Sequence, residues 1–178
     1  MSYLSVPPFD AKAVANYFLE LANRDGKTLD AMKIQKLVYL AHGWSLALLG
    51  RPLIADKIEA WQYGPVIRSL YGAFADCGSG PIQHPALDAR RAEGGRLVLT
   101  PARLEGIESP FNAKVKGLLD EVWRAYGSYT GIELSNYTHQ DGTPWAQTWR
   151  PGVDGLVISD ESIKDHFHQL ATANEPAR

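Results

Sequence analysis

Metal binding and nucleophilic catalysis both depend on histidine, cysteine and acidic side chains at defined spacings. The chain has five histidines and one cysteine. His166 and His168 are two residues apart, so on a helix they point away from each other, and neither a CxxC pair nor an HExxH motif is present. We therefore expect solvated or hydrogen-bonded histidines, no metal site and no cofactor.

The patterns that mark catalytic centres are also missing. Cys77 lies in a Gly/Ser-rich stretch without a recognisable signature, and the sequence has no GxSxG motif, P-loop or dinucleotide fingerprint. A Cys–His pair assembled by folding stays open as an alternative. A carboxylate cluster is a second alternative, although solvated surface acids are the simpler interpretation of Asp25, Asp30, Asp56 and Glu59. We predict no catalytic residues and no enzyme activity.

Large aromatic side chains are the stronger sign of a binding surface. Trp61 and Tyr63 share one side of a short alternating stretch beside Gly64-Pro65, and Trp145 lies in a Gly/Pro-rich loop. Aromatic side chains at a surface frequently anchor protein partners. Core packing is the alternative for Trp61 and Tyr63.

Hydrophobic periodicity predicts the helices that hold these residues in place. The stretch at about 28–49 is apolar around most of its circumference, so we expect a central buried helix with Thr28 as its N-cap and Gly50 at its end. Further helices are expected at 11–23 after an Asp10 cap, at 65–74 with Pro65 first, at about 110–126 after a Ser109 cap, at 131–137 with a Thr130/Glu133 capping box, at Thr143–Trp145 and after Ser159.

Two stretches alternate like strands, residues 57–63 and 96–100, and we expect them to pair as one ribbon against the helices. The Gly-, Pro- and Arg-rich region at about 77–109 indicates an irregular insertion, and 171–178 a disordered tail. At this length we predict one domain, 1–178, of the mainly α class. It is a single-domain helical bundle around the buried central helix (about 28–49) with a small two-stranded β ribbon.

The formal net charge of −2 and a composition of 45% hydrophobic and 21% charged residues are typical of a globular protein. One cysteine suits a reducing compartment, and the longest apolar stretch is too short to span a bilayer, so we expect a cytoplasmic protein without membrane association. The charge argues against nucleic-acid binding. Four arginines form a loose basic patch whose positive charge is reduced by Glu93 and Glu105: Arg90, Arg91, Arg96 and Arg103. Two interpretations are open, a solvated loop and a local contact with nucleic acid.

The run from Thr28 to Trp44, TLDAMKIQKLVYLAHGW, resembles the signature of the Panacea antitoxin domain family, also called phage-associated GepA-like or SocA-type proteins. Members carry a Lys-aliphatic-Gln-Lys-Leu core, as Lys33 to Leu37 do here. The segment from Gln83 to Gly106 departs from the family pattern. Further matching pieces follow in order: Gly50–Leu53, Ile58–Val66, Tyr71, Leu118–Trp123, Tyr126–Gly127, Glu133–Ser135, Thr138–His139 and Pro144–Trp145.

The resemblance implies a mostly helical, non-enzymatic antitoxin, associated with prophages, that neutralises a cognate protein toxin from an adjacent gene by direct binding. SocA-like members further imply a role as a proteolytic adaptor that delivers the toxin to the protease ClpXP. A DNA-binding autoregulator of its own operon is the alternative function. The sequence assigns neither the toxin nor an oligomeric state.

Three polar residues begin a helix that is otherwise largely apolar: Lys33, Gln35 and Lys36. Our hypothesis is that they form a polar platform near the Trp61–Pro65 turn and shape the partner surface together with Tyr39, Trp61 and Tyr63, with Trp145 as a further contact. The alternative is that Gln35 and the lysines brace the turn by donating hydrogen bonds to its carbonyl groups.

Overall fold

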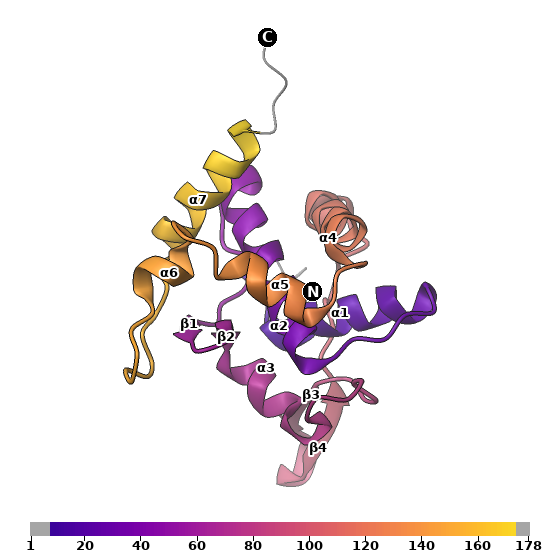
Figure 1. The fold of residues 1–178 in the computed structure, drawn as a ribbon. Coiled ribbons are helices and arrows are strands. Elements are labelled where there is room, and N and C mark those ends of the chain that lie inside the picture. Colours follow the sequence, from indigo (N-terminus) through magenta and orange to yellow (C-terminus); the bar gives the residue numbers. More distant parts are fainter. Residues whose placement is uncertain (1–7, 174–178) are drawn as a thin grey trace.

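A computed structural model describes residues 8–173 and places helices around one central helix (Figure 1). The mainly α class predicted from the sequence is confirmed. The α-helices are α1 (Ala11–Arg24), α2 (Ala31–Trp44), α3 (Arg68–Ala73), α4 (Ala113–Tyr126), α5 (Gly131–Thr138), α6 (Pro144–Thr148) and α7 (Asp160–Ala173). Shorter helical turns are η1 (Ser45–Leu49), η2 (Ala75–Cys77), η3 (Glu93–Gly95) and η4 (Pro110–Asn112). The strands are β1 (Ile58–Trp61), β2 (Gly64–Ile67), β3 (Leu87–Arg91) and β4 (Leu97–Pro101).

Helix α2 is the buried centre that its sequence predicts. Ile34, Leu37 and Leu40 are wholly buried, and α1, α3, α4, α5 and α7 all pack on this helix. Its N-cap is Asp30, whose carboxylate accepts a hydrogen bond from the Lys33 amide at 2.7 Å, so the prediction of Thr28 was wrong by two residues. The helix continues through the π-helical η1 to Gly50, which has a φ of 70° that glycine adopts without strain.

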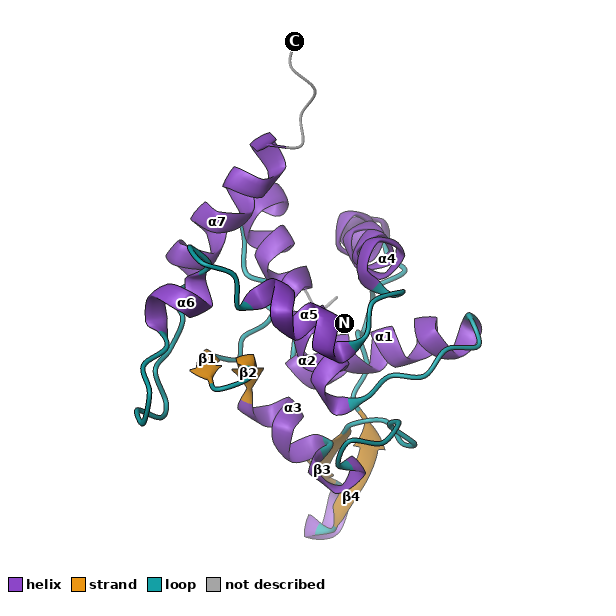
Figure 2. Ribbon diagram, viewed as in Figure 1, coloured by secondary structure: helices purple, strands orange, loops and turns teal. Residues whose placement is uncertain are grey.

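The strands form two separate ribbons, which corrects the predicted pairing of 57–63 with 96–100. β1 pairs with β2 across a tight reversal, and β3 pairs with β4 (Figure 2). Pairing between neighbouring segments closes a much shorter loop and therefore loses less chain entropy. Pro65 lies in β2 opposite Ala60, so it does not begin the following helix, which starts at Arg68.

The β3–β4 hairpin occupies much of the region predicted as an irregular insertion. The buried side chain of Asn16 holds both ends of this hairpin: its amide donates to the Ala86 and Ala102 carbonyls at 2.9 and 2.8 Å, and its carbonyl accepts from the Ala86 amide at 2.8 Å. This buried amide group is thereby satisfied entirely by backbone groups.

The remaining helix boundaries largely follow the predictions. Asp10 caps α1, and the Thr130–Glu133 capping box and the Thr143 cap are present. A 3-10 turn, η4, intervenes after Ser109, so α4 begins only at Ala113.

Helix α7 extends through Ala173, beyond the predicted end, and the rest of the predicted tail, 174–178, lies outside the described residues. Within residues 8–173, no helix is long and apolar enough to cross a membrane.

Gly43 of α2 packs directly against the Phe167 ring of α7. A Cβ atom at Gly43 would lie 2.3 Å from the Phe167 ring, whereas one at Gly117, on the exposed side of α4, would meet nothing within 4 Å. Gly43 is therefore the residue that lets α7 approach the centre.

We predict that Gly43→Ala lowers the free energy of unfolding by about 1–3 kcal/mol, because the added methyl overpacks this contact. Gly117→Ala is the control and should raise it by about 0.5–1 kcal/mol through helix propensity alone. Urea unfolding of both variants measures the difference. Equal stability of the two variants would contradict this packing.

Candidate functional site

Two polar residues near the start of α2, Gln35 and Lys36, form hydrogen bonds with the backbone of the β1–β2 ribbon. The Gln35 side chain donates to the Ile67 carbonyl at 3.1 Å and accepts from the Ile67 amide at 2.9 Å, so it pairs with the backbone as another strand would. Lys36 Nζ donates to the Pro65 carbonyl at 3.2 Å. All three hydrogen bonds go to the backbone of β2, which for Gln35 and Lys36 is the bracing arrangement that the sequence left open as the alternative.

Lys33 performs a similar task at the end of α4. Its Nζ donates to the carbonyl of Gly127 at 2.9 Å and lies 5.6 Å from the centre of the Trp123 ring. A cation at the C-terminus of a helix interacts favourably with the free carbonyls there. The three polar side chains therefore connect α2 to two different neighbours.

These residues do not form the exposed platform of our hypothesis. Lys33, Gln35, Lys36 and Tyr39 are between 2% and 7% exposed. The β1–β2 ribbon and the surrounding helices cover most of these side chains, and Gln35 and Lys36 contribute only small areas to the groove described below.

Burial has a chemical consequence for Lys36. Removal of the ammonium group from water lowers the pKa of Lys36 from 10.5 to about 7. Gly64, which has a φ of 105°, lies directly over this side chain: a Cβ there would be 2.7 Å from Lys36 Cε. Glycine at position 64 thus serves both the turn and the close approach of the lysine.

Three of the aromatic residues predicted to contact a partner, Trp61, Tyr63 and Trp145, differ in how far they are exposed. Trp145 is only 8% exposed, and its indole donates to the Trp61 carbonyl at 2.7 Å, so it fixes the turn and is not a surface contact. The Trp61 ring is partly buried, donates to Glu59 at 2.9 Å and lies 5.0 Å from the Tyr71 ring. Tyr63 is 63% exposed.

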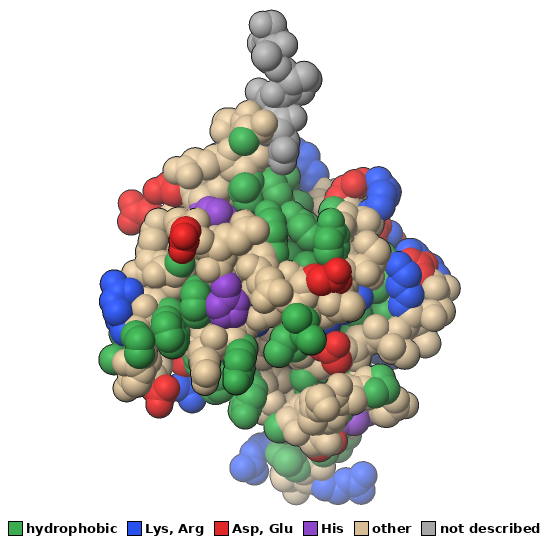
Figure 3. All heavy atoms as spheres, in the orientation of Figure 1, with side chains coloured by type: hydrophobic (Ala, Val, Ile, Leu, Met, Phe, Trp, Pro, Cys, Tyr) green, Lys and Arg blue, Asp and Glu red, His purple; other side chains and the backbone are tan. Residues whose placement is uncertain are grey.

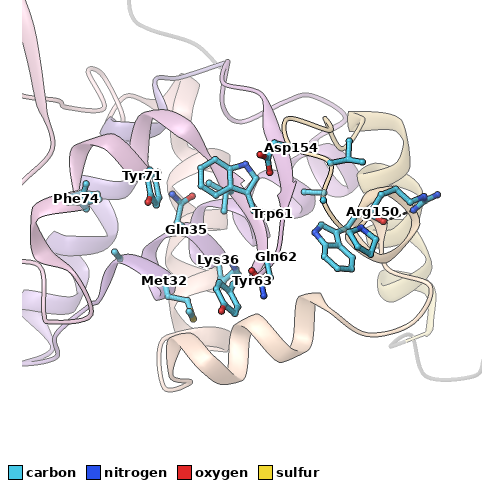
Figure 4. A pocket seen from close by; sticks show the side chains of 18 of the residues that line it. Met32, Gln35, Lys36, Trp61, Gln62, Tyr63, Tyr71, Phe74, Arg150 and Asp154 are labelled. Atoms are coloured by element: carbon cyan, nitrogen blue, oxygen red, sulfur yellow. Dashed lines mark hydrogen bonds between the residues drawn. The ribbon is translucent and has the colours of Figure 1, made fainter.

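Trp61, Tyr63, Gln35 and Lys36 contribute to the lining of one groove of about 850 Å³. Hydrophobic side chains gather on the face that carries β1–β2 and the loop after α6 (Figure 3). Figure 4 shows Trp61 at the middle of the groove, with Tyr71 of α3 and Phe74, which follows α3, to one side and Arg150 to the other. Among the described lining residues, the ionisable side chains are Lys36, Arg150, Asp154 and two tyrosines, and no histidine, cysteine or serine is present.

Sequence reasoning missed two walls of this groove. Tyr71, which is 57% exposed, was matched to the family pattern but was not assigned to the binding surface, and residues 150–154 were given no role. An available signal was the Gly/Pro-rich composition of 150–155, which is typical of surface loops that carry function.

The other candidate clusters separate in the structure. Asp25 accepts from Trp123, Asp30 caps α2, Asp56 accepts from Ser69, and Glu59 pairs with Arg68, so the four carboxylates do not share a site. Arg90, Arg91 and Arg96 lie on or beside the β3–β4 hairpin, away from the groove, and Arg90 pairs with Glu105 at 3.4 Å. Arg103 follows β4 and lines a separate, smaller pocket.

Comparison with known proteins identifies relatives. The sequence model of the family described as "Antitoxin SocA-like, Panacea domain" matches residues 34–146. Antitoxin SocA of Caulobacter vibrioides (strain NA1000 / CB15N) is 32% identical over 162 residues, which cover 89% of this chain and 82% of that protein. No solved structure matches the chain significantly. The matched segment contains Gln35, Lys36 and the β1–β2 ribbon, whereas the groove loop 149–154 follows it.

The lowered pKa of Lys36 leads to an unusual dependence of stability on pH. Between pH 7 and 10.5 the folded chain binds fewer protons at Lys36 than the unfolded chain does, so the free energy of unfolding rises with pH in this window. Below pH 7 both states are protonated and the full penalty of burying the charge is present.

We therefore expect wild type to gain stability relative to Lys36→Met by on the order of 1 kcal/mol per pH unit from pH 7 to 10. Urea unfolding across this range measures the difference. Lys114→Met, which removes an exposed lysine, is the control and should follow wild type in parallel. A parallel curve for Lys36→Met as well would refute the depressed pKa.

Proposed function

The chain belongs to the family of SocA-like antitoxins with a Panacea domain, as its sequence resemblance indicated, and we propose that it neutralises a cognate toxin by direct protein–protein binding. The groove over β1–β2 is the proposed docking surface, and the protein acts without catalysing a reaction. The partner is the product of an adjacent gene, and the pair acts in the cytoplasm.

The exposed aromatic side chains are the observation that supports this surface. Tyr63 and Tyr71 are 63% and 57% exposed and both line the groove. The Trp61 ring lies 5.0 Å from the Tyr71 ring, and its indole nitrogen donates to Glu59. Aromatic residues in a pocket are frequent anchors of protein interfaces. The proposed occupant is a segment of the toxin with apolar or aromatic side chains, because the groove wall is mostly aromatic and aliphatic.

The buried residues support the proposal indirectly. Gln35 and Lys36 fix β2, and Trp145 fixes the end of β1, so the ribbon that carries Trp61 and Tyr63 is held by hydrogen bonds on two sides. A rigid ribbon loses little entropy on binding. A standard interface of about 1,600 Å² in total requires surface around the groove as well as the groove itself.

The DNA-binding alternative has weaker support. The arginines that it requires lie on the β3–β4 hairpin, where Arg90 is paired with Glu105, and the whole chain has a net charge of −2. The family match does not favour it either.

We predict that Tyr63→Ala together with Tyr71→Ala abolishes rescue from toxicity when the chain is co-expressed with the neighbouring gene's product. Loss of two aromatic anchors at about 2 kcal/mol each corresponds to a rise in Kd of about 10³-fold. Calorimetric titration of the purified pair measures that change.

Tyr129→Ala is the matched control, since Tyr129 is 47% exposed but lies outside this groove. It should rescue like wild type. Because all three tyrosines are exposed, the variants should keep the wild-type thermal transition. Full rescue by the double variant would place the toxin elsewhere on the surface.

The adaptor route is a second step of the same proposal, supported by the resemblance to SocA-like members. We expect addition of this chain to purified ClpXP and toxin to accelerate toxin degradation, because the chain holds the toxin near the protease. The Tyr63/Tyr71 double variant should lose this acceleration. If adding the wild-type chain leaves the toxin half-life unchanged, the adaptor route is wrong. Neutralisation would then occur only because the bound chain covers the toxin's working surface.

A further inference from the structure

Three side chains that can bind a metal ion converge after α3. His84 Nε2 lies 2.9 Å from an oxygen of Asp76 and 3.7 Å from Cys77 Sγ, and Cys77 Sγ lies 3.7 Å from the other Asp76 oxygen. One ligand atom from each residue lies within 4.8 Å of the other two. Asp76 is exposed, and Cys77 and His84 are partly buried.

These separations resemble the edges of a zinc coordination tetrahedron. Bond lengths of about 2.3 Å to sulfur and about 2.0–2.1 Å to nitrogen or oxygen place sulfur about 3.6 Å from either lighter ligand in a regular tetrahedron. Both sulfur distances in the structure are 3.7 Å. The nitrogen–oxygen edge of such a tetrahedron is about 3.4 Å. The 2.9 Å contact of His84 is to the other Asp76 oxygen, so a cation bound through one oxygen requires the Asp76 carboxylate to turn.

The orientation of the His84 ring also suits the role of a metal ligand. Its Nδ1 lies 3.2 Å from the Pro85 carbonyl, so the Nδ1–H donates to that oxygen and Nε2 faces Asp76 and Cys77. Metal-binding histidines commonly donate their second ring nitrogen to a carbonyl or carboxylate in this way. Hydrogen bonds to the Pro85 carbonyl and the Asp76 carboxylate raise the pKa of His84, so a metal ion at Nε2 has to displace a proton when it binds.

The backbone between the ligands is anchored to the fold. The Gly80 amide donates to the Cys77 carbonyl at 3.0 Å, and the Ile82 amide donates to the Leu29 carbonyl at 2.8 Å, just before α2. Cys77 and His84 are therefore held on either side of a fixed loop. Ala75 and Gly78 of the same segment line the groove described above.

We propose that Asp76, Cys77 and His84 bind one divalent cation of the zinc class through a carboxylate oxygen, a thiolate and His84 Nε2. The thiolate favours zinc over magnesium or calcium, which prefer oxygen ligands. Three protein ligands leave a fourth position for water or a partner side chain. This inference is independent of the proposed antitoxin activity, and it revises the sequence-based expectation that the chain has no metal site.

Cobalt titration of the full, reduced chain tests the proposal. Co²⁺ bound to a thiolate gives a charge-transfer band, and Cys77 is the only cysteine of the sequence, so this band reports on one residue. We expect one Co²⁺ per chain, displaced by one equivalent of Zn²⁺. Cys77→Ser should abolish the band, and Asp76→Asn and His84→Ala should each weaken Co²⁺ binding at least tenfold.

His168→Ala is the control for adventitious binding to an exposed histidine and should titrate like wild type. Thermal unfolding in metal-free buffer verifies that each variant folds. The proposal fails if no charge-transfer band forms, or if Asp76→Asn and His84→Ala both bind Co²⁺ as wild type does. A second measurement is the rate at which a thiol reagent alkylates Cys77 in wild type. Zn²⁺ should slow this reaction, and an unchanged rate would also refute the proposal.

Discussion

Helix α2 carries two lysines and a glutamine into the interior, and each of them needs a hydrogen-bond partner there. A buried polar group without a partner costs about 1–3 kcal/mol, and a buried charge costs more. The partners are carbonyl and amide groups of Pro65, Ile67 and Gly127, which belong to the β1–β2 ribbon and the end of α4. The position of both neighbours is thus set by the polar start of the central helix, and the groove exists because the ribbon is held there.

Helix α2 illustrates which features of the fold can be predicted from the sequence and which cannot. The periodicity of Ile34, Leu37 and Val38 located the buried helix, since helical periodicity depends only on local spacing. The pairing of the strands depends on contacts between distant segments, and the sequence of β1 does not specify whether β2 or β4 is its partner. The burial of Lys36 was missed for a related reason: a lysine normally lies at the surface, and only the fold reveals that Gly64 and Pro65 cover it.

The candidate site was predicted in part. Trp61 and Tyr63 do line the groove, whereas Trp145 is not among its described lining residues and hydrogen-bonds the Trp61 carbonyl. The spacing of Cys77 and His84 matches no common metal motif, because the intervening loop turns back through its contact with Leu29. Sites assembled by a loop in this way are visible only in three dimensions. The groove and this cluster nevertheless share the segment after α3, so a ligand at one would bear on the geometry of the other.

The attachment of the β3–β4 hairpin by Asn16 has an evolutionary consequence. The hydrogen bonds of the Asn16 side chain to Ala86 and Ala102 all go to main-chain atoms, so this attachment does not depend on the side chains at those two positions. Asp88 of the hairpin also pairs with Lys12 of α1. The rest of the hairpin, residues 89–101, can change in length and composition while these two attachments stay intact, as surface connections generally tolerate. The hairpin is in this sense an exchangeable module, through which homologues could diversify while they keep the same central helix.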